Sequence, residues 1–248
     1  PPAMFTPRAG RCWLVAVFAV FAGACPLEQK MSLEVIDAPL RARGIELTGV
    51  DGPGESLQLG PYAVRKVERT QSGRGEALLA AALPRPASYH QLRFEVAAGE
   101  RTWQVRCEAQ RRQARNPDLA GELDESHDEV GVVCRLAGPD QDRWTLRVAG
   151  NLGRGLGGEL RAASEGAEPG ALAYEIEVIV RRNFVRVVDR ELPIPVAQLR
   201  RKQMAAAAML LGRPERAWLA PGLNGPDREL AVVAMAALRL LPIGHGEL

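Results

Sequence analysis

The chain has 248 residues, of which 46% are hydrophobic and 25% are charged, a composition that excludes an intrinsically disordered or a fibrous protein. It carries 32 basic and 30 acidic residues. This near balance provides no global attraction to nucleic acid or to an anionic membrane, so nucleic acid is not an expected partner.

The first 24 residues have the pattern of a signal peptide. An apolar run over residues 13–24 follows Arg8 and Arg11, and it is shorter than the about 20 residues that a membrane-spanning helix needs. The run ends in Ala-Gly-Ala at residues 22–24, which fits the small-residue rule for signal-peptide cleavage. The sequence therefore predicts removal of residues 1–24 and export of residues 25–248.

Cleavage at this point would make Cys25 the first residue of the processed protein. A cysteine in this position resembles the lipobox of bacterial lipoproteins, in which the thiol is acylated and the lipid anchors the protein to a membrane. Acylation and plain secretion both stay open as interpretations. In either case we expect a periplasmic or outer-membrane-anchored protein of a bacterium.

Cys107 and Cys134 are the cysteines left after Cys12 is assigned to the signal peptide and Cys25 to lipidation. In an oxidising compartment such a pair is expected to form a disulfide. Each of the two alternates with apolar neighbours, so both side chains are predicted to point into a core. Neither belongs to a CxxC motif, which argues against a zinc site or a redox pair.

Alternation of apolar and polar residues dominates the chain from residue 30 to residue 190. This pattern is typical of antiparallel strands with one buried face. It is clearest over residues 101–109, 143–149 and 174–181, and shorter examples cover residues 33–36, 45–48, 62–68, 91–96, 132–136, 159–162 and 184–189. The sequence predicts a single mainly β domain over residues 25–248, an antiparallel sandwich or barrel of about ten strands.

Two helical segments are predicted near the C-terminus. Residues 196–211 are rich in helix-forming residues. A last helix over residues 228–241 could be capped by Asn224 or Asp227, and from residue 230 onward it is apolar on all sides except at Arg239. Such a helix is too short to cross a bilayer, so we expect strands to enclose it.

The segment Arg-Ala-Trp-Leu-Ala-Pro-Gly-Leu at residues 216–223, followed by this apolar helix, resembles the end of the tubby-like barrel. Tubby C-terminal domains, phospholipid scramblases and LURP-one-related proteins share that architecture. The resemblance implies a closed barrel threaded by the C-terminal helix, and a role in binding or handling lipid. In that superfamily a strand occupies the place where residues 196–211 predict a helix.

Two motifs have a structural interpretation that is simpler than the functional one. Residues 153–158 read GRGLGG and match GxGxxG, but a strand pattern follows them where a dinucleotide site needs a helix, so we interpret them as a hairpin loop. Asp124, His127 and Asp128 are candidate metal ligands within an acidic loop. Their spacing does not fit a calcium loop, and a solvated loop explains them.

No catalytic residue or cofactor is predicted. His90 alternates with apolar residues and is interpreted as a core histidine, and neither GxSxG nor HExxH occurs in the chain. The sequence favours an envelope protein with a non-enzymatic binding or structural role, whose partner is an envelope protein or a lipid. An envelope hydrolase without a recognisable motif and a tubby-like lipid-binding protein are the alternatives.

Overall fold

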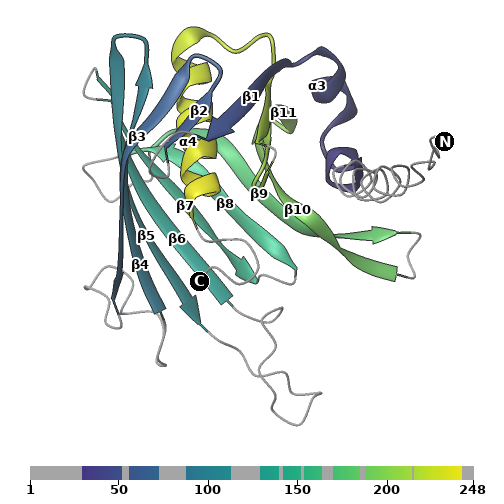
Figure 1. Cartoon of the computed structure of the whole chain (residues 1–248). Coiled ribbons are helices and arrows are strands. Elements are labelled where there is room, and N and C mark those ends of the chain that lie inside the picture. The colour runs from purple at the N-terminus through teal and green to yellow at the C-terminus, as the bar shows by residue number, and fades with distance from the viewer. Residues whose placement is uncertain are drawn as a thin grey trace, which may run out of the picture.

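A computed structural model describes residues 30–51, 56–72, 88–112, 129–139, 142–151, 154–163, 170–184, 188–213 and 215–241. Within these ranges twelve strands form a closed antiparallel barrel, in which each strand pairs with its neighbours in chain order and β1 closes the ring by pairing with both β2 and β12 (Figure 1). The strands are β1 (Ile45–Asp51), β2 (Leu57–Leu59), β3 (Tyr62–Ser72), β4 (Ser88–Ala98), β5 (Arg101–Arg112), β6 (Glu129–Ala137), β7 (Arg143–Asn151), β8 (Gly155–Ala162), β9 (Leu172–Phe184), β10 (Val188–Arg201), β11 (Met204–Leu210) and β12 (Arg216–Leu219). The mainly β antiparallel fold is confirmed, and it is a barrel.

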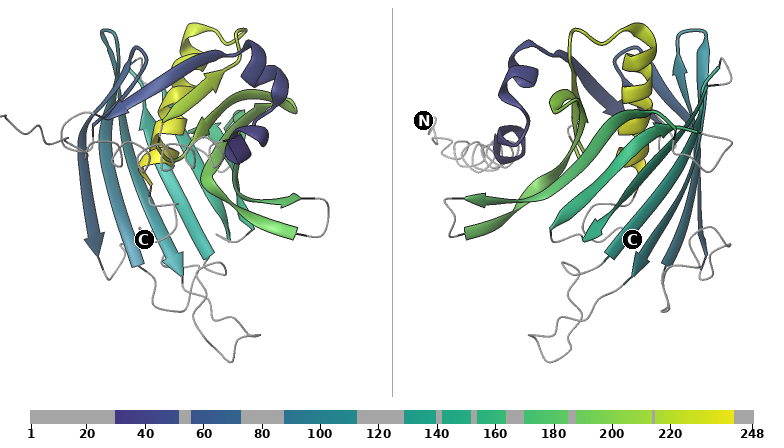
Figure 2. Two further views of the ribbon diagram at one scale, coloured as in Figure 1. Left: turned by 45° about the vertical axis from the view of Figure 1, so that its right-hand side comes forward. Right: turned by 180° about the vertical axis from the view of Figure 1, so that it is seen from behind.

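The C-terminal helix α4 (Gly225–Leu240) lies inside this ring of strands (Figures 1 and 2). Ala231 and every residue from there to Leu238 are completely buried, on all sides of the helix axis. These side chains share one core with the inward-facing residues of the strands. The predicted enclosure of the helix is therefore confirmed.

The N-terminal end of α4 is tied to the barrel wall by hydrogen bonds. Asn224 caps the helix by accepting a hydrogen bond from the Asp227 amide at 2.8 Å. The phenol of Tyr174 on β9 donates to the Asp227 carbonyl at 3.0 Å, and the Trp103 indole on β5 donates to Glu229 at 3.1 Å. These bonds hold the first turns of the helix against two different strands.

The prediction of a helix over residues 196–211 is wrong, because these residues form β10 and β11. The usual alternation is missing here since both faces of the two strands are buried. Ala197 and Leu199 face the central core with α4, whereas Val196 and Leu210 belong to a second apolar cluster on the other face. Two-sided burial makes a strand read as a continuous apolar run and overrides its local helix propensity.

The second cluster exists because the N-terminal segment covers the outer face of β10, β11 and β12. Residues 30–34 are helical, and α3 (Ala38–Arg43) follows. Ile36 and Leu40 pack against Trp218 of β12, and the buried amide of Gln198 donates to the Val35 carbonyl at 2.6 Å. The strand expected over residues 33–36 is wrong, since this segment packs on the barrel from outside through a helical turn.

Cys107 on β5 and Cys134 on β6 are direct partners in the register of the two strands, and a disulfide joins them. Both side chains point into the central core and are buried. The bond was predicted from the alternation around each cysteine, and the structure contains it.

Candidate functional site on the outer wall

His90, which the sequence analysis interpreted as a core histidine, lies on the inner face of the barrel. It stands on the face of β4 that carries the buried residues Leu92 and Phe94. Burial lowers the pKa of its imidazole, and the positive charges of Arg111 and Arg69 lower it further. His90 faces inward as expected, but the side chain is only half-buried, and its Nε2 has no hydrogen-bond partner among the described residues.

The C-terminal end of α4 is anchored by the charged side chain of Arg69 on β3. The Arg69 guanidinium donates to the Leu240 carbonyl at 2.7 Å, at the C-terminal end of α4, where a positive charge is favourable. At the opposite end of the helix, burial together with the nearby Asp227 carboxylate raises the pKa of Tyr174 to about 12, so its phenol stays a donor. The inward-facing polar groups thus hold the helix in place.

The outer face has a different character, because three arginines stand side by side across three neighbouring strands. Arg93 on β4 is the register partner of Arg106 on β5, which in turn is the register partner of Arg135 on β6. All three side chains are exposed. Like charges placed directly opposite each other on neighbouring strands destabilise a sheet.

A fourth exposed arginine, Arg147, lies on β7 one step along the strands from this row. Its register partner on β6 is Val133, and the partner of Arg135 on β7 is Thr145. Among the described residues, none forms an ion pair or hydrogen bond with Arg93, Arg106, Arg135 or Arg147. We call these four residues the arginine row.

The carboxylates nearest to the arginine row form no ion pair with it, although Glu159 on β8 is the register partner of Arg147 and Glu108 lies two residues from Arg106 on the same face of β5. Glu95 binds Lys66 at 3.0 Å, and Glu159 on β8 binds Arg161 at 2.8 Å. Glu108 is the register partner of Val133 on β6 and of Gln91 on β4. The row is therefore a local excess of positive charge within a chain whose charges almost balance.

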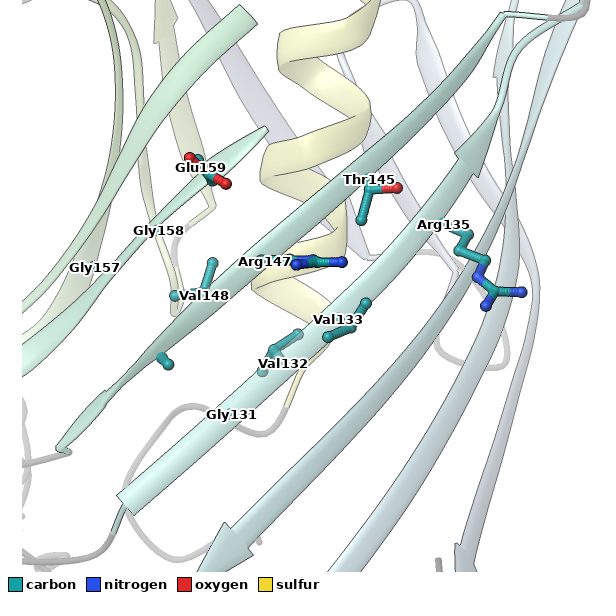
Figure 3. Close-up of a pocket in the computed structure, with 11 residues that line it drawn as sticks. Gly131, Val132, Val133, Arg135, Thr145, Arg147, Val148, Gly157, Gly158 and Glu159 are labelled. Carbon is teal, nitrogen blue, oxygen red and sulfur yellow. The ribbon is translucent and has the colours of Figure 1, made fainter. Parts of the chain in front are cut away.

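A hollow of about 550 Å³ lies beside Arg135 and Arg147 on the wall formed by β6, β7 and β8 (Figure 3). Gly131 and Gly157 have no side chain, and a Cβ atom added to either would meet open space. The hollow exists because these two positions are glycines. The lining residues are Gly131, Val132, Val133, Arg135, Thr145, Arg147, Val148, Ala149, Gly157, Gly158 and Glu159. The polar groups that line the hollow are the guanidiniums of Arg135 and Arg147, the Thr145 hydroxyl and the Glu159 carboxylate.

The hairpin interpretation of the glycine-rich motif fits the strands on either side of it. β7 ends at Asn151 and β8 begins at Gly155, so residues 155–158 of the motif are part of an antiparallel strand and only its start lies between the two strands. Gly158 lies within β8, where a Cβ atom would collide with the Arg147 carbonyl. This glycine is required for the close approach of two strands.

Several predicted site residues lie outside the described part of the chain. These are Cys25 and the candidate metal ligands Asp124, His127 and Asp128. Within the described ranges, no group of three or more His, Cys, Asp or Glu side chains could hold a metal ion. None of the helices in those ranges has both the length and the apolar character needed to cross a membrane.

The adjacent arginines Arg200 and Arg201 differ from the arginine row, because both have ion-pair partners. Arg200 pairs with Glu177 at 3.5 Å and Arg201 with Asp227 at 2.6 Å, both at the end of β10. The arginine row is dispersed along the chain, and only the register of β4, β5 and β6 brings it together.

Comparison of the chain with known protein families, with curated proteins and with solved structures gave no match. The fold and the outer wall together define the protein as a helix-filled antiparallel barrel whose outer face carries four arginines without an ion-pair partner in the described part of the chain.

Proposed function

We propose that the protein is an exported protein of a bacterial envelope, anchored by a lipid on Cys25, and that its barrel has a non-enzymatic binding role. The observation that supports this role best is the contrast between the two faces of the wall. The inner face packs around α4, whereas the outer face carries four exposed arginines without an ion-pair partner among the described residues. Charged side chains in this state are available to a ligand on the surface.

The position of the N-terminal segment is compatible with such an anchor. Only residues 26–29 separate Cys25 from the helical residues that lead into α3. α3 itself packs on β11 and β12. A lipid on Cys25 would therefore keep the barrel close to the membrane that holds it.

Mass spectrometry of the protein from a bacterial membrane fraction tests the anchor. We expect an N-terminal peptide that begins at Cys25 and carries fatty acids. A Cys25→Ser variant should leave the membrane fraction. A wild-type protein that keeps Trp13 in its N-terminal peptide would contradict export.

A tubby-like lipid-binding or lipid-handling role is the second candidate. It is favoured by the closed antiparallel barrel around a buried C-terminal helix, the architecture that the resemblance of residues 216–241 implied. The test is sedimentation of the Cys25→Ser protein, which has no anchor of its own, with phospholipid vesicles. Binding to both phosphatidylglycerol and phosphatidylcholine vesicles would support this candidate, and binding to neither would exclude it.

A further inference from the structure

We propose that the arginine row binds a linear anionic polysaccharide, of the kind that carries one carboxylate on each sugar. The inference rests on the proposed binding role of the outer wall and names its ligand. It starts from Arg93, Arg106 and Arg135, whose side-by-side placement costs stability unless an anion lies over them. All three are exposed, and no described residue forms an ion pair with them.

The shape of the row favours an extended ligand over a compact one. Neighbouring strands lie about 4.8 Å apart, so the row extends over about 10 Å from β4 to β6, across the strand direction. A single phosphate or sulfate group would have to draw the outer two guanidiniums together over one point, against the repulsion between them. A chain with an acidic group at regular intervals can meet them one after another, each through a charge-assisted hydrogen bond.

The surroundings of the row favour sugar over a densely charged surface. Glu108 and Glu159 stand on the same outer wall, and they would repel closely packed lipid phosphates. Carboxylates and the Thr145 hydroxyl can instead bond to the hydroxyl groups that separate the acidic groups of a polysaccharide. The hollow beside Arg135 leaves room for a sugar ring against the backbone of Gly131 and Gly157.

Single-stranded nucleic acid fits the wall less well. Its sequence-tolerant binding depends on aromatic side chains on which bases stack. Among the described residues of β4 to β7, which carry the row, Tyr89 is the one aromatic side chain on the outward face, and it accepts a hydrogen bond from Gln110 at 3.3 Å. Trp103 and Trp144 belong to the inner face with the core, so the wall has no series of aromatic side chains for successive bases.

The test uses protein purified from cells that express the full chain, with polygalacturonate as the probe. Its fully methyl-esterified form is the matched neutral ligand, because it keeps the sugar backbone and loses the charge. We expect binding to the acid form that weakens as salt is added, and no binding to the ester.

A variant with glutamine at the three side-by-side positions of the row (Arg93→Gln, Arg106→Gln, Arg135→Gln) should bind about tenfold more weakly. The matched control removes the same charge from exposed residues away from the wall: Lys30→Gln, Arg43→Gln and Lys202→Gln. It should bind like the wild type. Gly131→Ile, whose Cβ atom would meet nothing within 4 Å, places an apolar side chain at the floor of the hollow and should also weaken binding while the row stays intact.

Equal losses in the row variant and in its control would overturn the proposal, and so would equal binding to the ester. Tighter binding to phosphatidylglycerol vesicles or to single-stranded DNA would overturn it as well. Because binding is measured on purified protein, a chain that binds polygalacturonate but is not processed at Cys25 would support this inference and contradict the proposed export.

Discussion

His90 shows how one half-buried side chain can make the stability of the barrel depend on pH. Burial and the charges of Arg111 and Arg69 depress its pKa below the ordinary value of 6.5. The unfolded chain therefore binds the proton more readily than the folded one. As the pH falls through 6.5 toward the depressed value, the free energy of unfolding decreases, and above 6.5 this contribution is fully present.

We expect a His90→Gln variant to lose less stability than the wild type between about pH 7.5 and about pH 5.5, because its side chain does not titrate. Urea unfolding at the two pH values measures this difference. His127 and His245 are present in both proteins, so they contribute equally to the comparison. An identical pH dependence in both proteins would show that His90 is not the responsible group.

Single residues differ in how far the sequence alone could place them. The inward orientation of Cys107, Cys134 and His90 follows from alternation, which is a local pattern. The neighbourhood of Arg93 and Arg135 is not local, because it depends on the register of two strand pairs. A one-residue slip of either pair would move every side chain of a strand to the other face, so the row needed the structure.

At the scale of elements, α4 is the part of the fold on which the strongest mutational effect is expected. Met235 is completely buried at the middle of the helix. A Met235→Asp variant would place a carboxylate there, while the cation one turn along the helix, Arg239, is already paired with Glu215 at 2.6 Å. We expect the variant to lose more than about 4 kcal/mol or to fail to fold. Urea unfolding and the yield of folded protein measure the loss.

The matched variant Met235→Leu keeps an apolar side chain of similar volume at the same position and should cost less than about 1.5 kcal/mol. If the aspartate variant melts like the leucine variant, the helix does not lie in the core, and the enclosed-helix architecture is wrong.

β10 and β11 were mispredicted as a helix, whereas α4 was predicted well, and the difference has a physical reason. In α4 the local preference and the burial agree, since alanine, leucine and methionine favour a helix and also fit a core. In β11 they disagree, because Ala206, Ala207 and Ala208 favour a helix but pack as a strand. α4 lies against one face of this wall and the N-terminal segment against the other, and neither partner is visible in a local window of sequence.

At the scale of the whole molecule, closure of the barrel is the feature that strand patterns alone could not give. The closing strands β2 and β12 have only 3 and 4 residues. β1 meets β12 through pairs such as Glu46 with Trp218, which are far apart in the chain. Alternation predicts that a strand has a buried face, but sandwich and barrel both provide one.

The disulfide connects the stability of this whole barrel to the compartment in which the chain folds. Cys107 and Cys134 are 27 residues apart, and a cross-link over that distance restricts the unfolded chain by about 3 to 4 kcal/mol in the entropy model. We expect the oxidised protein to be more stable than the reduced protein by about that amount, as measured by urea unfolding with and without reductant. The reductant should have no effect on a Cys107→Ala, Cys134→Ala double variant. Equal stability of the oxidised and reduced wild-type protein would show that the disulfide does not stabilise the fold. The fold would then not depend on an oxidising compartment for its stability.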